Sequence, residues 1–152
     1  MLKISTPFSQ VDTELKFALG SRTSDRSSNE YIYLQGTAGI TTDDLVRYDN
    51  NFVAQRAIAG LRGPLAVTQG SIVASRYGWC KVKGLANIRA NGAIVARVPL
   101  FLTAGSGAVD DAIVAGDLIL GAFSSVAGTA AAGTMVDAVL SYPFAGSLSV
   151  AA

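Results

Sequence analysis

Residues 77–123 read YGWCKVKGLANIRANGAIVARVPLFLTAGSGAVDDAIVAGDLILGAF. In the first run, every second position from Cys80 to Ile88 carries an apolar or small side chain. The intervening positions are polar or aromatic, with Leu85 as the one aliphatic exception; they are Trp79, Lys81, Lys83, Leu85, Asn87 and Arg89. Because successive side chains of a strand point to opposite faces, this pattern indicates a half-buried strand.

A second run, from Ile94 to Leu102, alternates in the same way, with Arg97 on the opposite face. Between the two runs lies Ala90-Asn91-Gly92, and an Asn-Gly pair readily takes the positive φ angles of a hairpin turn. We therefore predict a hairpin, with residues 77–89 paired to residues 94–102. No reactive group lies in it, so it is a scaffold element.

The composition indicates one domain with large covered surfaces. Of the 152 residues, 50% are hydrophobic, only 15% are charged, and 16 are glycine. So few charges favour contacts with a partner. No apolar stretch reaches the ~20 residues of a membrane span, and residues 1–10 lack the apolar centre of a secretory signal. The sequence has one cysteine and no histidine, so an intramolecular disulfide is excluded and the commonest general base is absent.

Charge is segregated along the chain although the net charge is only +1. Residues 1–49 carry five basic and seven acidic groups, residues 50–109 carry seven basic groups and no acid, and four aspartates follow from Asp110 onward. Two interpretations are open. Either surfaces of opposite charge meet between neighbouring subunits or on an acidic partner, or the basic and acidic blocks neutralise each other within one globule.

Short strands separated by turn residues predict an all-β fold, a compact β-sandwich or barrel of short antiparallel strands with an extended N-terminal arm. Residues 9–19 fit either a helix with a capping box or an alternating strand, and we favour the extended arm. The predicted organisation is an arm and loop (1–30), a β domain (31–144) and a flexible tail (145–152). Pro143 is expected to end the last strand, in which Val136, Ala138, Leu140 and Tyr142 share one face. Residues 40–46 (ITTDDLV) echo residues 113–119 (IVAGDLI), and a shared turn type explains this better than a duplication.

Candidate chemical groups are few, and we predict no catalytic, cofactor-binding or metal-binding residue. Cys80 is expected to be a buried, inert thiol. Asp110 and Asp111 could hold a cation, but neighbouring aspartates in an exposed turn point apart. Phosphate-binding glycine loops are missing, and a pI of about 7.8 with a single tryptophan argues against nucleic-acid binding.

Seven stretches, taken in one order, resemble the small head decoration (cement) proteins of tailed bacteriophages. They are TPFSQVDTELKFALG (6–20), NEYIYLQGTAGITTDDLV (29–46), GLRGPLAVTQGSI (60–72), YGWCKVKG (77–84), VPLFLTAGSGAVDD (98–111), AGDLILGA (115–122) and LSYPF (140–144). The resemblance implies a β-rich virion protein, assembled in the host cytoplasm, that binds the outer surface of the capsid and bridges neighbouring capsomers. Its implied partners are the major capsid protein and further copies of itself, a homotrimer rather than a dimer, without a membrane.

No contact motif transfers from that family, so interface residues are predicted from physical arguments. Residues 1–20, with Phe8, Val11, Leu15 and Phe17, are candidates for strand exchange with a neighbour. The open face of the predicted hairpin supplies Trp79, Lys81, Lys83, Arg89 and Arg97. The alternative function is a head or tail adhesion module binding a host receptor or glycan, which exposed loop aromatics such as Tyr48 and Tyr77 would favour.

Overall fold

The computed structural model describes residues 4, 6–127 and 132–146, and within them it contains strands and turns but no helix. The strands are β1 (Val11–Asp12), β2 (Arg22–Ser24), β3 (Glu30–Gln35), β4 (Leu45–Tyr48), β5 (Ala54–Arg56), β6 (Gly63–Thr68), β7 (Tyr77–Asn91), β8 (Pro99–Leu102), β9 (Val109–Asp110), β10 (Leu118–Ser124) and β11 (Ala132–Ala145). The all-β prediction is therefore confirmed. No helix among these residues could cross a membrane.

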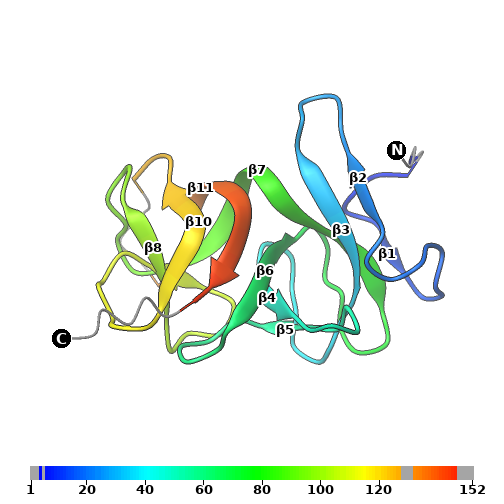
Figure 1. The fold of residues 1–152 in the computed structure, drawn as a ribbon, viewed down its shortest axis with the longest axis horizontal. Helices are drawn as coiled ribbons and strands as arrows, with labels where there is room; N and C mark the ends of the chain where they lie inside the picture. Colours follow the sequence, from blue (N-terminus) through cyan, green and yellow to red (C-terminus); the bar gives the residue numbers. More distant parts are fainter. Residues whose placement is uncertain (1–3, 5, 128–131, 147–152) are drawn as a thin grey trace.

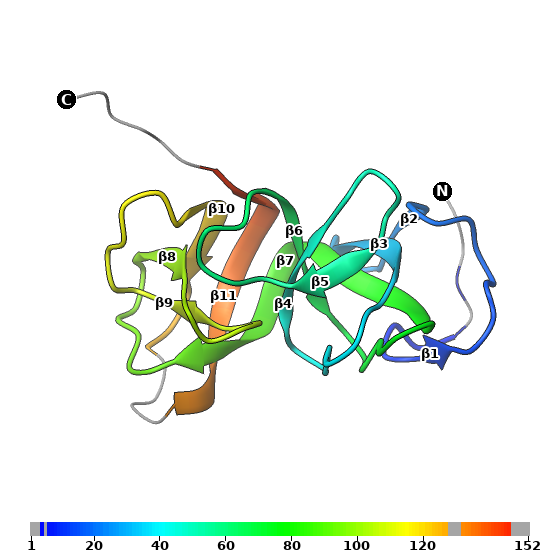
Figure 2. The same ribbon diagram turned by 90° about the horizontal axis from the view of Figure 1, so that it is seen from below.

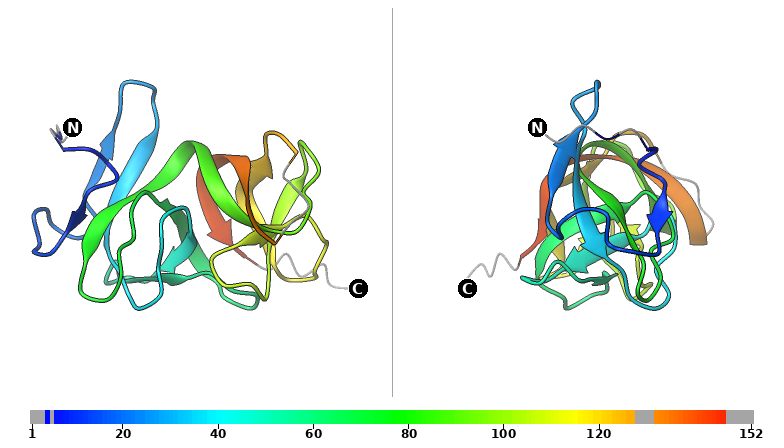
Figure 3. Two further views of the ribbon diagram at one scale, coloured as in Figure 1. Left: turned by 180° about the vertical axis from the view of Figure 1, so that it is seen from behind. Right: turned by 90° about the vertical axis from the view of Figure 1, so that its right-hand side faces the viewer.

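Six strands close into a barrel, whose yellow and orange-to-red strands β8, β10 and β11 lie together at one end of the molecule in the left-hand view of Figure 3. Each strand in the order β7-β9-β8-β10-β11-β6 bonds to the next, and β6 also pairs with β7. The pair β7–β9 is parallel, through Ala90 and Val109. The predicted barrel is thus present, and its strands pair antiparallel apart from β7–β9, although two of them are long. β7 has 15 residues and β11 has 14, because both curl across the molecule.

β7 connects the two halves of the elongated molecule, as Figures 1 and 2 show. Its first half pairs with β3 and β6, and its second half pairs with β11. The buried positions that the alternation predicted are confirmed: Cys80 and Val82, before Gly84 in the strand, and Ala86 and Ile88, after it, are all buried. Gly84 has φ +111°, and a Cβ there would lie 1.9 Å from Asn29 Oδ1, so only glycine fits at this crossover.

The predicted hairpin is wrong, because β7 and β8 are not neighbours. β9 lies between them, and β8 pairs with β9 and β10. Arg97 adopts φ +61° in a turn that interrupts the second run before β8 begins at Pro99. The alternation identified which residues of β7 are buried, but it carries no information about which strand lies alongside.

Three hydrophobic clusters follow one another along the molecule. The barrel interior contains residues such as Ile88, Leu100 and Leu140. A middle cluster contains Ile32, Leu34 and Cys80, and an aromatic cluster at the N-terminal end centres on Tyr31, Tyr33 and Trp79. β3 sends alternate side chains into the middle cluster and the aromatic cluster. Both faces of this strand are therefore covered.

The described part of the N-terminal segment is not an extended arm. β1 pairs with the start of β7, with Val11 opposite Gly78 and Asp12 opposite Tyr77. Phe8 and Phe17 pack against the aromatic cluster of their own chain. The predicted arm is therefore not confirmed, because Phe8, Val11 and Phe17 pack within the molecule.

β11 runs past Pro143 to Ala145, so the prediction that Pro143 ends the strand is wrong. A bulge accommodates the proline: between the pairs Leu120–Phe144 and Ala122–Leu140, residues 141–143 lie opposite Gly121 alone. Tyr142 takes φ +50° there and is 50% exposed, so it leaves the inner face that Val136, Ala138 and Leu140 share. Residues 147–152 of the predicted tail lie outside the described residues.

The echo between residues 40–46 and 113–119 is a shared turn. Asp43 and Gly116 occupy matching positions with φ +64° and +87°. Each turn closes with a backbone hydrogen bond, from Asp44 to Thr41 and from Asp117 to Val114, and each leads into a strand that begins with leucine. The shared-turn interpretation explains the echo without a duplication.

Candidate interaction surfaces

Trp79, predicted on an open face, is buried at the centre of the aromatic cluster and is only 2% exposed. Its ring centroid lies 5.1 Å from that of Tyr33 and 5.3 Å from that of Phe17, and the ring of Phe8 approaches it edge-on at 6.2 Å. The N-terminal segment covers the face of β7 that the alternation left open. The sequence contained one sign of this covering. Tyr31 and Tyr33 alternate with Ile32 and Leu34, so both faces of β3 carry large side chains that need to be covered.

The four N-terminal candidates divide into three that pack within the chain and one that does not. Phe8 stacks on Tyr31, with centroids 3.8 Å apart and planes 9° apart, and Phe17 meets Tyr33 at 5.2 Å. Val11 packs against the middle cluster. Leu15 is 54% exposed and is the member of this group that a partner can reach.

A polar belt holds the N-terminal segment against the aromatic cluster. Asp12, itself buried, accepts a hydrogen bond from Tyr33 Oη at 2.7 Å and pairs with Lys16 Nζ at 2.9 Å. Burial would raise the pKa of Asp12, but the bonds from Tyr33 and Lys16 together outweigh it and lower that pKa. Burial and the bond to Asp12 raise the pKa of Tyr33.

Asp44 is the centre of a buried charge network, with 0% of its side chain exposed. Arg89 Nε donates to its Oδ1 at 3.1 Å. Arg56 Nε lies 3.1 Å from Asp44 Oδ2. The two groups form an ion pair, but the N–H is not aligned for a hydrogen bond. The backbone N–H of Thr41 also donates to Oδ2, at 2.8 Å. The candidate Arg89 therefore serves an internal contact.

The charge blocks partly neutralise each other, as the second interpretation of the charge pattern expects. Arg56 and Arg89 of the basic block pair with Asp44 of the first block, and Arg62 pairs with Asp117 of the last at 3.4 Å. Of the remaining basic candidates, Lys81 is half-buried. Its Nζ lies 5.5 Å from the centroid of the Tyr31 ring, and it donates to the Leu85 carbonyl at 2.8 Å. Burial lowers its pKa.

Lys83 and Arg97 are exposed but are not brought together. Lys83 projects from β7 and Arg97 from the turn before β8, and β11 and β10 lie between these strands. The two lysines and two arginines of the predicted face thus do not form one basic patch. Only Leu15, Lys83 and Arg97, among the nine predicted interface residues, are exposed.

The outer wall of the barrel carries an exposed apolar row that the sequence reasoning did not identify. Leu85, Val139, Phe123 and Pro99 lie directly opposite one another on β7, β11, β10 and β8. Opposite residues share a face, so they form one continuous row across four strands. Leu85 is 51% and Phe123 46% exposed. In the sequence, the sign of this apolar row was Leu85, the aliphatic exception to the alternation of β7.

Polar residues flank this apolar row on both sides. Lys83 pairs with Ser141 one step along the strands in one direction, and Asn87 pairs with Asp137 one step in the other. An apolar centre with a polar rim is the usual anatomy of a protein–protein contact.

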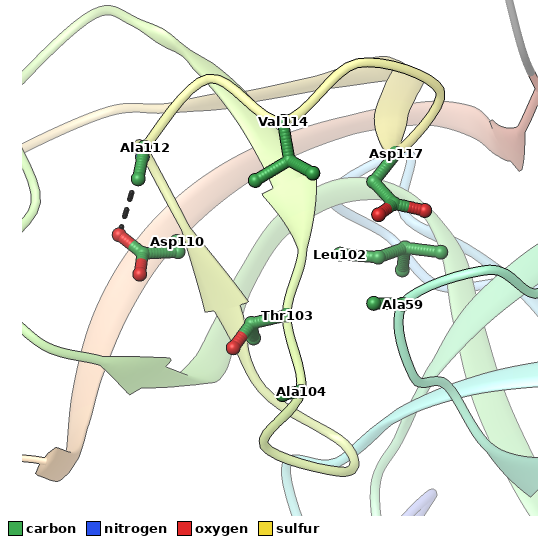
Figure 4. A pocket seen from close by; sticks show the side chains of 8 residues that line it. All are labelled: Ala59, Leu102, Thr103, Ala104, Asp110, Ala112, Val114 and Asp117. Carbon is green, nitrogen blue, oxygen red and sulfur yellow. Dashed lines mark hydrogen bonds between the residues drawn. The ribbon is translucent and has the colours of Figure 1, made fainter.

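A pocket of about 240 Å³ lies between the β8–β9 turn and the loop before β10 (Figure 4). Its two carboxylates are occupied: Asp110 accepts from the backbone of Asp111 and Ala112, and Asp117 accepts from Gly60 and Arg62. Asp111 turns away and accepts from the Val95 N–H at 2.7 Å. The prediction that the two adjacent aspartates point apart is confirmed. In the described parts of the chain, no group of three or more His, Cys, Asp or Glu side chains could hold a metal ion.

The aromatic side chains that would favour an adhesion module are not exposed in loops. Tyr48 is 7% exposed within β4, and Tyr77 is half-buried at the start of β7. Cys80 is fully buried, as predicted, and burial raises the pKa of its thiol. No protein-family model matches the chain, and no curated protein sequence matches it.

Proposed function

We propose that this protein is a structural virion protein of a tailed bacteriophage, a head decoration protein that binds the outer surface of the capsid and bridges neighbouring capsomers. The observation that carries the proposal is the apolar row on the outer wall of the barrel. The resemblance of seven ordered stretches to decoration proteins is the second line of support.

The apolar row suits a static contact because it is held on a rigid element. Its four side chains come from four hydrogen-bonded strands of a closed barrel, so little conformational entropy is lost on binding. A stable specific contact buries about 800 Å² per partner, and such contacts concentrate their energy in a few central apolar and aromatic residues. Phe123, between Val139 and Pro99, is the central anchor.

A decoration protein needs only modest affinity at each site. Many copies on one particle, bridging subunits of the same shell, multiply weak contacts through avidity. We keep the expectation of a homotrimer as part of the proposal. Sedimentation equilibrium of the purified protein measures it directly.

The test is binding to expanded capsids that lack this protein, prepared from the phage that encodes it. Purified protein is mixed with the capsids and bound copies are counted after sedimentation. We expect wild type to saturate a fixed number of sites and Phe123→Asp to bind at least tenfold more weakly. Ile113→Asp is the matched control, because Ile113 is 87% exposed and lies outside the row.

Two outcomes separate the parts of this proposal. If wild type does not bind the capsids, the proposed function is wrong. If wild type binds and Phe123→Asp binds equally well, a different surface makes the contact.

A further inference from the structure

A groove runs along the junction between the barrel and the middle cluster. It consists of two pockets of about 220 and 280 Å³ that meet at Tyr48 and Pro64, which line both. Each pocket alone falls below the ~300 Å³ typical of a ligand site, whereas the two joined exceed it. We call it the arginine groove, because Arg22 lines one pocket and Arg47 and Arg62 line the other.

The floor of the arginine groove is apolar and fixed. Leu65 and Val82 are each 1% exposed, and Tyr48 closes the floor between the pockets. Tyr142 and Phe144 line the same pocket and are 50% and 44% exposed, because the β11 bulge turns Tyr142 outward. The Tyr142 hydroxyl donates to the Glu30 carboxylate, which fixes the ring at the rim.

Three arginines line the groove against one lining carboxylate, so the charge of its lining is positive although Arg62 is paired with Asp117 and Glu30 lies at the rim. Asp49 is the one carboxylate that lines either pocket, and its Oδ1 already accepts from the Asn51 and Val53 backbone. Arg62 donates to the Leu61 carbonyl at 2.8 Å and reaches Asp117, outside the groove, only at 3.4 Å.

Arg47 is the most informative of the three arginines. Its Nε is buried and has no hydrogen-bond partner among the described residues. A Cβ at Gly63 would lie 3.3 Å from Arg47 Cδ, so the arginine stem rests directly on the backbone of the groove. A buried donor without a partner is costly; because Nε is covered, an incoming carboxylate would bind the terminal Nη groups of Arg47 and not Nε itself.

We propose that the arginine groove binds an extended acidic segment of a partner protein. Glutamate or aspartate side chains would pair with the guanidinium groups, which match a carboxylate with two parallel hydrogen bonds, and intervening apolar side chains would cover the floor. Arginine and tyrosine are also the residue types that dominate binding energy at protein contacts. A net charge of only +1 gives weak attraction for a nucleic acid, which favours a peptide as the occupant.

The test uses a dye-labelled, end-capped peptide of four Glu-Val repeats, titrated with the full chain and followed by fluorescence anisotropy. We expect saturable binding that weakens with salt, and no binding of the matching Lys-Val peptide. Arg47→Met keeps the apolar stem and should weaken binding at least tenfold, and exposed Arg22→Ala should also weaken it. Arg76→Met is the control, because Arg76 lines neither pocket and should change binding less than twofold.

The proposal fails if the Glu-Val peptide shows no saturable binding or if the Lys-Val peptide binds as tightly. It also fails if an eight-residue oligothymidine binds more tightly than the acidic peptide, which would make the groove a nucleic-acid site. Equal losses in Arg47→Met and Arg76→Met, or none in Arg22→Ala and Arg47→Met, overturn it as well. None of these outcomes depends on capsid binding, so this proposal and the proposed function stand or fall separately.

Discussion

Replacing Asp44 by asparagine removes one buried charge on which two cationic side chains converge. The asparagine oxygen can still accept from the Thr41 N–H, so the turn before β4 is preserved. Arg56 and Arg89, each 3.1 Å from the carboxylate, lose their counterion. The substitution therefore tests charge pairing at nearly constant shape.

The expected loss follows from the burial of the three groups. Breaking a fully buried ion pair by removing one partner costs about 3–5 kcal/mol. Asp44 is fully buried, but the two arginine side chains are each 31% exposed, so water partly replaces the lost interaction. We expect unfolding to become easier by about 2–4 kcal/mol, somewhat below the fully buried range.

The assay is urea unfolding followed by circular dichroism, read as a lower midpoint at an unchanged slope. Asp43→Asn is the matched control: it makes the same chemical change one residue earlier, at a φ of +64° that asparagine tolerates. Because burial raises the pKa of Asp43, the folded protein disfavours its charged form, and we expect neutralisation to cost less than about 0.5 kcal/mol of stability.

A double-mutant cycle of Asp44→Asn with Arg89→Met should show coupling above about 0.5 kcal/mol. If both asparagine variants lose the same stability, or if Asp44→Asn loses less than about 0.5 kcal/mol, the charge network does not stabilise the fold as we reason.

Three further predictions concern the same framework. Trp79→Ala should lower the unfolding free energy by about 3–5 kcal/mol in urea titrations, because it empties the centre of the aromatic cluster, and a loss below about 1 kcal/mol would contradict its buried position. Because the folded-state pKa of Asp12 lies below its ordinary value of 3.8, the unfolded chain binds the proton first as pH falls. The stability that Asp12 provides should be present above about pH 5 and lost towards pH 2, and Asp12→Asn should flatten this part of the urea-midpoint profile. Gly84→Ala should lower the unfolding free energy by about 1–3 kcal/mol or more, because its φ of +111° is strained for alanine and the added Cβ would clash with Asn29. Gly92→Ala has a similar φ of +114° but nothing within 4 Å of the added Cβ, so it should cost less in the same titration.

Several structural features were predictable from neighbouring residues alone. The all-β class, the strand at Tyr31–Leu34 and the buried positions Cys80, Val82, Ala86 and Ile88 follow from β propensity and period-2 alternation, which depend on local backbone geometry. The shared turn of residues 40–46 and 113–119 is also local. So is the opposed direction of Asp110 and Asp111.

Strand partners and covered faces were decided only in three dimensions. Alternation in β7 separates two faces, but it does not show that β11 rather than β8 lies alongside, or that Phe8 and Phe17 return to cover Trp79. For the same reason, the basic residues between positions 50 and 109 form a block without acids in the sequence but are dispersed in space. Asp44 and Asp117 form ion pairs with three of them.

The candidate surfaces show this division most clearly. By itself, the sequence determined a low-charge β protein with one unexplained leucine at position 85. Only the tertiary structure placed Phe123, Val139 and Pro99 beside that leucine, because residues that are far apart in the chain become neighbours when strands pair. The arginine groove arose in the same way, since Arg22, Arg47 and Arg62 belong to separate segments that meet only where the barrel joins the middle cluster.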